Sequence, residues 1–317
     1  MPNFSGRTGS WPDTCTRAGL TRVGTLVILV GRRTAGEVIV EREIKTRRIK
    51  FRYPAGSMRR HYVQDDLGMS HVVSVLSGAF PEGEAFMIRS VRAVADQITD
   101  PELKKQVAGF IGQEATHSRE HRELNERLQE MGYPTAFIDR ATRRGLEART
   151  RYSSAKYCLA MTAALEHYTA ILAETLLTDE RAQQMLGQGE VRSMLLWHAL
   201  EESEHRTVAF DVYQAVGGTN RMRVFVMWFT TCGFFTLAAC ASFISLFRDR
   251  DFYNPRISFR SAIRLFRSPF FSREVFRRLV SYSRKDFHPD DVDNTELIAT
   301  WNAVLFGEQG QIADHVH

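Results

Sequence analysis

The sequence predicts an all-α protein whose centre is a bundle of four long helices, and three observations lead to this prediction. Apolar residues recur at intervals of three and four through four long segments, which is the spacing of a helix with one buried face. Pro and Gly lie mostly at the joints between these segments. With 317 residues, of which 44% are hydrophobic, the chain is large enough to bury a sizeable core. The four helices are expected at residues 71–97, 101–131, 153–177 and 190–215.

The ends of these helices follow from capping residues and helix breakers. Asp100 followed by Pro101 is a typical start signal, because Asp accepts hydrogen bonds from the free N–H groups of a first turn and Pro lacks an N–H. The glycine pair at 217–218 ends the fourth helix. Pro81 and Gly83 fall inside the first helix, where we expect a kink or a split.

Two segments before the bundle differ from it in composition. Residues 1–37 are rich in Arg and contain no apolar run long enough for the core of a signal peptide, so we expect a poorly ordered leader. Residues 38–53 alternate between charged and β-branched or aromatic types, which predicts a strand or an extended arm. The expected organisation is a leader at 1–37, the arm and the approach to the bundle at 38–70, the bundle at 71–218 and a helical extension at 219–317.

The extension begins with an uncharged, apolar segment at residues 224–247, which is longer than the roughly 20 residues that cross a bilayer. Three interpretations stay open: a membrane span, a segment that dips into the membrane and returns near Gly233, and a helix buried in the bundle or in a homodimer contact. Residues 248–285 then hold eleven Arg or Lys against three acidic residues, mixed with Phe, Leu and Ile at helical intervals. An amphipathic basic segment of this kind can lie on anionic lipid, so we expect contact with a membrane.

The four cysteines show neither a disulfide framework nor the paired spacing of a metal site, which is typical of a reducing compartment. We therefore expect a cytoplasmic protein, associated with the inner face of the cell membrane. The basic residues are mixed with many aliphatic ones and no nucleic-acid-binding module is visible, so no nucleic-acid partner is expected.

Two of the expected helices carry the same metal-binding spacing. Glu114 and His117 lie three residues apart, so both side chains leave one face of the second helix about one turn apart. Glu202 and His205 repeat this spacing on the fourth helix, with His198 one turn earlier on the same face. Both polar stripes are continued by apolar residues, which predicts that both point into the core. These residues are Phe110, Leu124 and Leu128 on one helix, and Met194, Ala209 and Val212 on the other.

Two further carboxylates complete a set of metal donors. Glu84 on the first helix and Glu166 on the third lie in apolar surroundings, with Glu82 and Glu174 as the alternatives. This is the ligand pattern of the ferritin-like di-iron and di-manganese carboxylate bundles, in which two helices give one Glu each and two give a Glu-x-x-His each. Because buried ionisable groups need compensation, the sequence predicts two metal ions here, with iron expected and manganese as the alternative.

Five neighbouring ionisable residues receive other expectations. His121 is expected to orient a metal ligand or to add one. Four more lie off the inward faces and are expected to meet solvent or neighbouring helices. These are Glu120, His167, Glu201 and Glu204.

Several segments resemble the recurrent blocks of a family of bacterial proteins catalogued as predicted metal-dependent hydrolases, over roughly residues 38–300. The segments are RYPAGSMRRHYVQDD, FPEGEAF, QEATHSREHRELN, LEHYTA, WHALEESEHRTVAFDVY and SRKDFHPDD. The order His198-x-x-x-Glu202-x-x-His205 also resembles the ligand helix of the di-iron arylamine N-oxygenases. Carried over by position, the resemblance implies seven metal ligands, which are Glu84, Glu114, His117, Glu166, His198, Glu202 and His205.

The ligand types favour oxygen chemistry over the reaction in the family's description. With O2 and an electron donor, a di-iron centre would hydroxylate, desaturate or N-oxygenate a small hydrophobic or lipid-like substrate. The first alternative is a hydrolase in which two metals acidify a water molecule. The second is a non-catalytic metal-binding or membrane scaffold protein. No catalytic role is assigned to residues beyond the metal centre.

Overall fold

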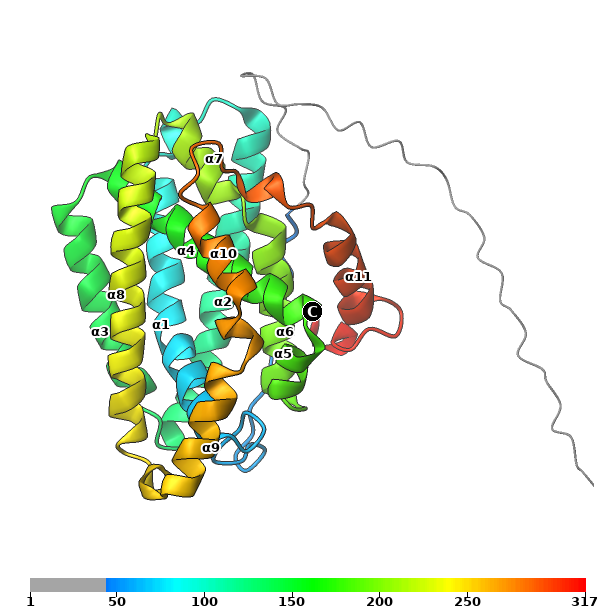
Figure 1. Cartoon of the computed structure of the whole chain (residues 1–317). Coiled ribbons are helices and arrows are strands. Elements are labelled where there is room, and N and C mark those ends of the chain that lie inside the picture. The colour runs from blue at the N-terminus through cyan, green and yellow to red at the C-terminus, as the bar shows by residue number, and fades with distance from the viewer. Residues whose placement is uncertain (1–43) are drawn as a thin grey trace, which may run out of the picture. The chain divides into compact units, whose positions relative to one another are not determined.

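The computed structural model describes residues 44–317 and confirms the all-α class (Figure 1). In this range we find helices and no named strand, and the one β contact is an isolated bridge between Ile49 and Val316. Residues 44–53 are therefore an arm, as one of the two interpretations of this segment predicts. The leader predicted at 1–37 and the start of the arm at 38–43 lie outside the described residues.

Four helices surround the centre of the molecule: α1 (Leu67–Arg92), α2 (Pro101–Glu130), α4 (Ala155–Thr178) and α6 (Glu190–His205). α1 packs against α2 and α4, and α6 packs against the same two helices, so the four close a ring around one interior. α2 and α4 match their predicted ranges within two residues at each end. The ferritin-like assignment of this ring stays a prediction.

The other helices cover the ring or connect its members, and residues 44–317 all fall within one compact unit. They are α3 (Thr135–Tyr152), α5 (Glu180–Met185), α7 (Val208–Ala215), α8 (Asn220–Leu246), α9 (Pro255–Phe266), α10 (Arg273–Ser281) and α11 (Thr295–Phe306). Short 3-10 turns are η1 (Ala95–Gln97), η2 (Arg250–Tyr253), η3 (Pro269–Phe271), η4 (Pro289–Asp291) and η5 (Ala313–His315).

Helix α1 is continuous through Pro81, so the expected split does not occur. Proline has no N–H to donate to the carbonyl four residues earlier, which leaves the carbonyl of Ser77 without its helical partner. Asn125 of α2 supplies the missing donor, because its Nδ2 lies 2.8 Å from the Ser77 oxygen. A side chain of the neighbouring helix thus satisfies the backbone group that Pro81 leaves free.

The fourth predicted helix, 190–215, is wrong as a single element, because a turn at Arg206 and Thr207 separates α6 from α7. Arg206 is buried, and its guanidinium donates to the Glu174 carboxylate of α4 and to the backbone carbonyl of Val292. The start signals are confirmed, since Asp100 accepts hydrogen bonds from the first N–H groups of α2.

The arm lies directly on α2, where two glycines make room for it. A Cβ atom on Gly112 would lie 2.1 Å from Thr46 Oγ1, and one on Gly109 would lie 2.6 Å from the carbonyl oxygen of Ile44. Real Cβ atoms essentially never approach other atoms so closely. Further along the arm, the backbone N–H of Phe51 donates to Glu120. Glu120 was one of the four residues expected to lie off the inward faces, and it contacts the arm.

Helix α8 packs along α1 and α4 on one side of the ring, and Figure 1 shows it in yellow. It is one continuous helix through Gly233, which disagrees with a segment that reverses its direction there. Among the described residues, α8 is the one helix long and apolar enough to cross a membrane, and 17% of its most apolar window is buried. Cys158, Cys232 and Cys240 are free thiols.

Candidate metal centre

The seven side chains predicted as metal ligands meet in the interior of the ring. Each is no more than 5% exposed. Phe110, Leu124 and Met194, predicted to continue the two ligand stripes, are fully buried, which confirms that both stripes face inward. The seven come from all four helices: Glu84 from α1, Glu114 and His117 from α2, Glu166 from α4, and His198, Glu202 and His205 from α6.

One group of donor atoms surrounds His205. Its Nε2 atom lies 3.1 Å from Glu114 Oε1, 3.3 Å from Glu166 Oε2 and 3.6 Å from Glu202 Oε2. Three carboxylates from three helices therefore converge on one imidazole nitrogen.

A second group surrounds His117 and His198. His117 Nδ1 lies 3.6 Å from Glu202 Oε1 and 4.0 Å from Glu114 Oε1. His198 Nε2 lies 2.9 Å from Glu202 Oε1 and 3.8 Å from Glu84 Oε1. Glu114 and Glu202 belong to both groups, so these two carboxylates lie where they could bridge two ions.

Most of these converging atoms have no hydrogen-bond partner, although several lie close to one another. Such atoms are rare in folded proteins, because leaving a buried polar group unpaired costs about 1–3 kcal/mol, and more if it is charged. Nine atoms are affected: both carboxylate oxygens of Glu84, Glu114 and Glu166, Oε2 of Glu202, Nδ1 of His117 and Nε2 of His205.

The residues present fit divalent transition-metal ions. Carboxylate oxygens and imidazole nitrogens together are the donors of iron and manganese sites, and bound cations would satisfy the unpartnered atoms. Glu84, His117 and His198 would hold one ion and Glu166 and His205 the other. Such ions would also neutralise several buried carboxylates at once.

The pKa values show how poorly the protein alone accommodates these charges. Burial raises the pKa of Glu166 to about 8, against the opposing effect of His205. Burial also raises the pKa of Glu84 well above its ordinary value, and nearby Glu114 adds to the shift. Desolvation acts to lower the pKa of His117, but its contacts with Glu201 and Glu202 outweigh it and raise the pKa to about 10. Metal binding would therefore compete with protons at this centre.

Behind the two histidines lie partners that the sequence-based prediction did not identify. His117 Nε2 lies 3.0 Å from Glu201 Oε2, and His205 Nδ1 lies 2.8 Å from Gln113 Oε1. Each bond fixes the ring so that its other nitrogen faces the carboxylate cluster. A carboxylate or amide in this position typically fixes the tautomer and orientation of a metal-binding histidine.

Arg47 of the arm joins both partners. Its guanidinium donates to Glu201 and to Glu204, each at 2.8 Å, and Glu204 in turn accepts from Gln113 Nε2 at 2.8 Å. Glu201 and Glu204 were expected to meet solvent or neighbouring helices, and the solvent interpretation is wrong because both are buried. The doubled pattern Glu201-Glu202-x-Glu204-His205, in which one acid precedes each predicted ligand, is the sequence signal that could have revealed them.

His121 lies directly behind His198. Its Nε2 atom is 2.8 Å from His198 Nδ1, and its Nδ1 atom is 2.9 Å from Ser77 Oγ. Burial lowers the pKa of His121 well below its ordinary value, which keeps the ring neutral. Its contact with His198 fits the orienting role, and its place in a group of close donor atoms with Glu84 and His198 fits the ligand role, so both roles stay predictions. His167 lies elsewhere, 3.0 Å from the carbonyl of Arg278, in contact with a neighbouring helix.

The two alternative ligands lie outside the cluster and are engaged in ion pairs. Glu82 pairs with Arg122 and Arg143. Glu174 accepts from Arg206 and from Arg278. Neither belongs to the groups of close donor atoms around the predicted ligands.

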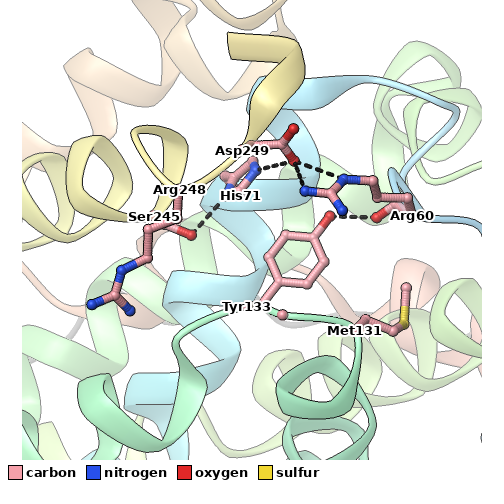
Figure 2. A pocket seen from close by; sticks show the side chains of 8 residues that line it. Arg60, His71, Met131, Tyr133, Ser245, Arg248 and Asp249 are labelled. Carbon is pink, nitrogen blue, oxygen red and sulfur yellow. Dashed lines mark hydrogen bonds and ion pairs between the residues drawn. The ribbon is translucent and has the colours of Figure 1, made fainter. Parts of the chain in front are cut away.

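A second buried group with metal-binding residue types lies where α8 ends (Figure 2). Asp249 Oδ2 is 3.3 Å from His71 Nε2 and 3.1 Å from both His61 Nε2 and the Arg60 guanidinium. His71 Nδ1 is in turn 2.6 Å from Ser245 Oγ. Unlike the nine atoms of the main cluster, these atoms all have hydrogen-bond or ion-pair partners, one of which is the Arg60 guanidinium. These contacts join the end of α8 to α1.

Comparison with known proteins agrees with the chemistry of the main cluster. The model of the family described as "Predicted metal-dependent hydrolase" matches residues 45–293, a range that contains all seven predicted ligands and His121. Comparisons with curated proteins and with solved structures gave no match. Because the match covers most of the 317 residues, the chain belongs to the predicted metal-dependent hydrolase family.

Proposed function

We propose that this protein is an enzyme with two metal ions in the interior of the α1, α2, α4 and α6 ring. The observation that supports the proposal best is the set of nine buried, unpartnered donor atoms. The number two is supported by Glu114 and Glu202, each of which faces both groups of donors. We propose iron as the metal and manganese as the alternative.

Metal analysis tests this proposal. We expect two ions per chain in protein purified from medium that contains iron and manganese. The double variant E114A/E202A should bind neither ion, whereas E82A, which removes a buried carboxylate that pairs with arginines outside the cluster, should bind both. A folded wild-type chain that binds no iron, manganese, cobalt or zinc would refute the proposal.

For the reaction, we propose O2-dependent oxidation of a small hydrophobic substrate, with electrons from a separate donor. Two redox-active ions supply the electrons that activate O2 in such proteins. The chain's own contribution is to orient the ligands and to exclude water. Aromatic rings pack against the histidines for this purpose: Trp197 lies 4.9 Å from His117, and Phe110 lies 5.0 Å from His205, measured between ring centroids.

Hydrolysis is the second candidate, and the description of the family supports it. Two ions can make a water molecule acidic enough at neutral pH to attack an ester, amide or phosphoester. This reaction needs neither O2 nor an electron donor.

One pair of measurements separates the two candidates. An oxidase should consume O2 when the iron-loaded protein receives a reductant, at a rate above that of free iron and of E114A/E202A. A hydrolase should instead cleave chromogenic ester or phosphoester probes without O2, even when loaded with redox-inert zinc. Protein that binds two ions but does neither supports the non-catalytic scaffold.

We also propose that the reaction takes place at the inner face of a cell membrane. This location is supported by the length and apolar character of α8. α8 packs against α4, the helix that carries Glu166, so the proposed metal centre and the apolar surface of α8 lie on either side of one helix.

A further inference from the structure

Helix α8 turns a wide apolar surface toward solvent. Its buried side contains few residues, whereas large side chains along its whole length are between 46% and 71% exposed. Monomeric soluble proteins rarely expose a continuous apolar surface of this kind. These exposed side chains are Phe225, Phe229, Phe235, Leu237, Phe243 and Phe247.

The next two helices extend the same pattern and add positive charge. In α9, Phe259 and Phe266 are 71% and 69% exposed, and their positions are seven apart, so they lie on one face of the helix. In α10, Phe276 is 66% exposed. Exposed arginines accompany these rings: Arg256, Arg260, Arg264 and Arg267 on and just after α9, and Arg273 and Arg277 on α10.

The three helices pack on the same two members of the ring. α8 packs on α1 and α4, α9 packs on α1, and α10 packs on α4, as can be followed in Figure 1. Trp228 Nε1 of α8 donates to Ser283 Oγ after α10 at 2.9 Å, which joins the two parts of this layer. On the other flank, the guanidinium of Arg149 in α3 lies 4.9 Å from the ring of Phe229. We call the exposed apolar side chains of α8, α9 and α10, with the arginines beside them, the basic apolar face.

Both ends of α8 are tied to the rest of the protein. Near its start, the fully buried Arg223 donates to the backbone carbonyls of Tyr282 and Arg284. At its end, Ser245 bonds His71 of α1. A transmembrane α8 would therefore take the packed helices and the charged surface of α3 into the bilayer with it, which is strongly unfavourable for charged side chains.

The charge of the face decides between a membrane and a second copy of the chain. In a symmetric dimer the arginines of one copy would face those of the other, and residues 248–285 contain only three acidic side chains to oppose them. Anionic lipid headgroups are the complementary partner, and Phe and Leu side chains can enter the acyl boundary beneath them.

We propose that the basic apolar face binds the surface of an anionic bilayer with the axis of α8 parallel to the membrane plane. This inference rests on the proposed membrane location and is independent of the metal centre. It replaces a membrane span with attachment to one leaflet, and it names anionic phospholipid as the partner.

Vesicle binding by the full-length, metal-loaded chain tests the lipid chemistry. The protein should bind vesicles that contain phosphatidylglycerol, release partly in high salt, and bind phosphatidylcholine vesicles much more weakly. R256Q/R260Q/R267Q should bind the anionic vesicles roughly 100-fold more weakly, since each cation near such a surface contributes about 1 kcal/mol. R48Q/K50Q/R52Q, an equal loss of charge on the exposed side of the arm, should bind like the wild type.

Two natural cysteines measure the orientation of α8. Cys232 and Cys240 are exposed on α8 and eight residues apart, which is about 12 Å along the helix axis. Spin labels are attached to either thiol alone, in chains in which the other cysteines are replaced by Ser or Ala. In vesicle-bound protein, both labels should report the same shallow depth.

Each outcome has a distinct meaning. Depths that differ by about 12 Å would show a span, which overturns the parallel attachment but keeps the membrane location. Equal binding to both kinds of vesicle, or no effect of R256Q/R260Q/R267Q, overturns the proposed role of anionic lipid. No binding to any vesicle overturns the location as well. If the protein forms a dimer without lipid and both thiols are shielded in that dimer, the partner of the face is a second copy of the chain.

Discussion

Replacing Glu201 by Gln tests whether the residues behind the histidines control the metal centre. Glu201 Oε2 lies 3.0 Å from His117 Nε2, and Arg47 holds the other oxygen at 2.8 Å. With a proton on Nε2, His117 turns Nδ1 toward Glu114 and Glu202. A neutral amide keeps the shape of the side chain but loses the charge that makes the imidazole a strong donor. We expect a 10- to 100-fold loss of metal affinity, equivalent to about 1.4–2.7 kcal/mol.

The assay is a competition titration of Mn2+ between the protein and a chromophoric chelator. E82Q is the matched control, because Glu82 is also buried, pairs with two arginines, and lies outside both the cluster and the arm. Thermal unfolding of both variants without metal shows whether they remain folded. Wild-type affinity in E201Q, or an equal loss in E82Q, would refute a specific role for Glu201.

Three further predictions concern stability. G112A would place a Cβ atom 2.1 Å from Thr46 Oγ1, so it should displace the arm and lower the free energy of unfolding by about 1–3 kcal/mol. Urea unfolding measures this, with G145A, at a position with open space, as the control. N125L removes the donor to the Ser77 carbonyl and should lower the free energy of unfolding by about 1–3 kcal/mol. Hydrogen exchange should show weaker protection of α1 near Pro81, and unchanged protection there would contradict the prediction. Burial alone would raise the pKa of Asp249, but hydrogen bonds from Asp251, His61, His71 and Arg60 lower it to about 2. A lowered carboxyl pKa stabilises the fold at pH values above the ordinary pKa near 4, and this stabilisation is lost as the pH falls toward 2. The free energy of unfolding of the wild type should therefore exceed that of D249N by about 1–2 kcal/mol at pH 5 and by less at pH 2. A difference that does not depend on pH contradicts this.

The sequence was informative where the signal is local. Asp100 and Pro101 mark the start of α2, and the Glu-x-x-His spacing places its two side chains on one face whatever surrounds the helix. The inward direction of both stripes could also be read from the apolar residues that continue them. Seven polar side chains could therefore be placed together before any coordinates were known.

What could not be predicted depends on contacts between distant residues. The turn at Arg206 accompanies its bonds to Glu174 and Val292, which lie 32 and 86 residues away in sequence. Pro81 stays inside a helix because Asn125, 48 residues from Ser77, replaces the lost donor. A helical wheel puts Glu201 beside the inward face, but only packing shows that it meets His117 instead of solvent.

The position of Arg47 links the arm to the proposed metal centre. This single guanidinium, supplied from outside the four-helix ring, holds both Glu201 and Glu204, and through them it fixes His117 and Gln113. Ions that draw His117 and His205 into place should also draw the arm onto α2, and release of the arm should loosen the ions. Protease cleavage near residue 50 should therefore slow as metal is added, which gives a readout of occupancy that needs no substrate.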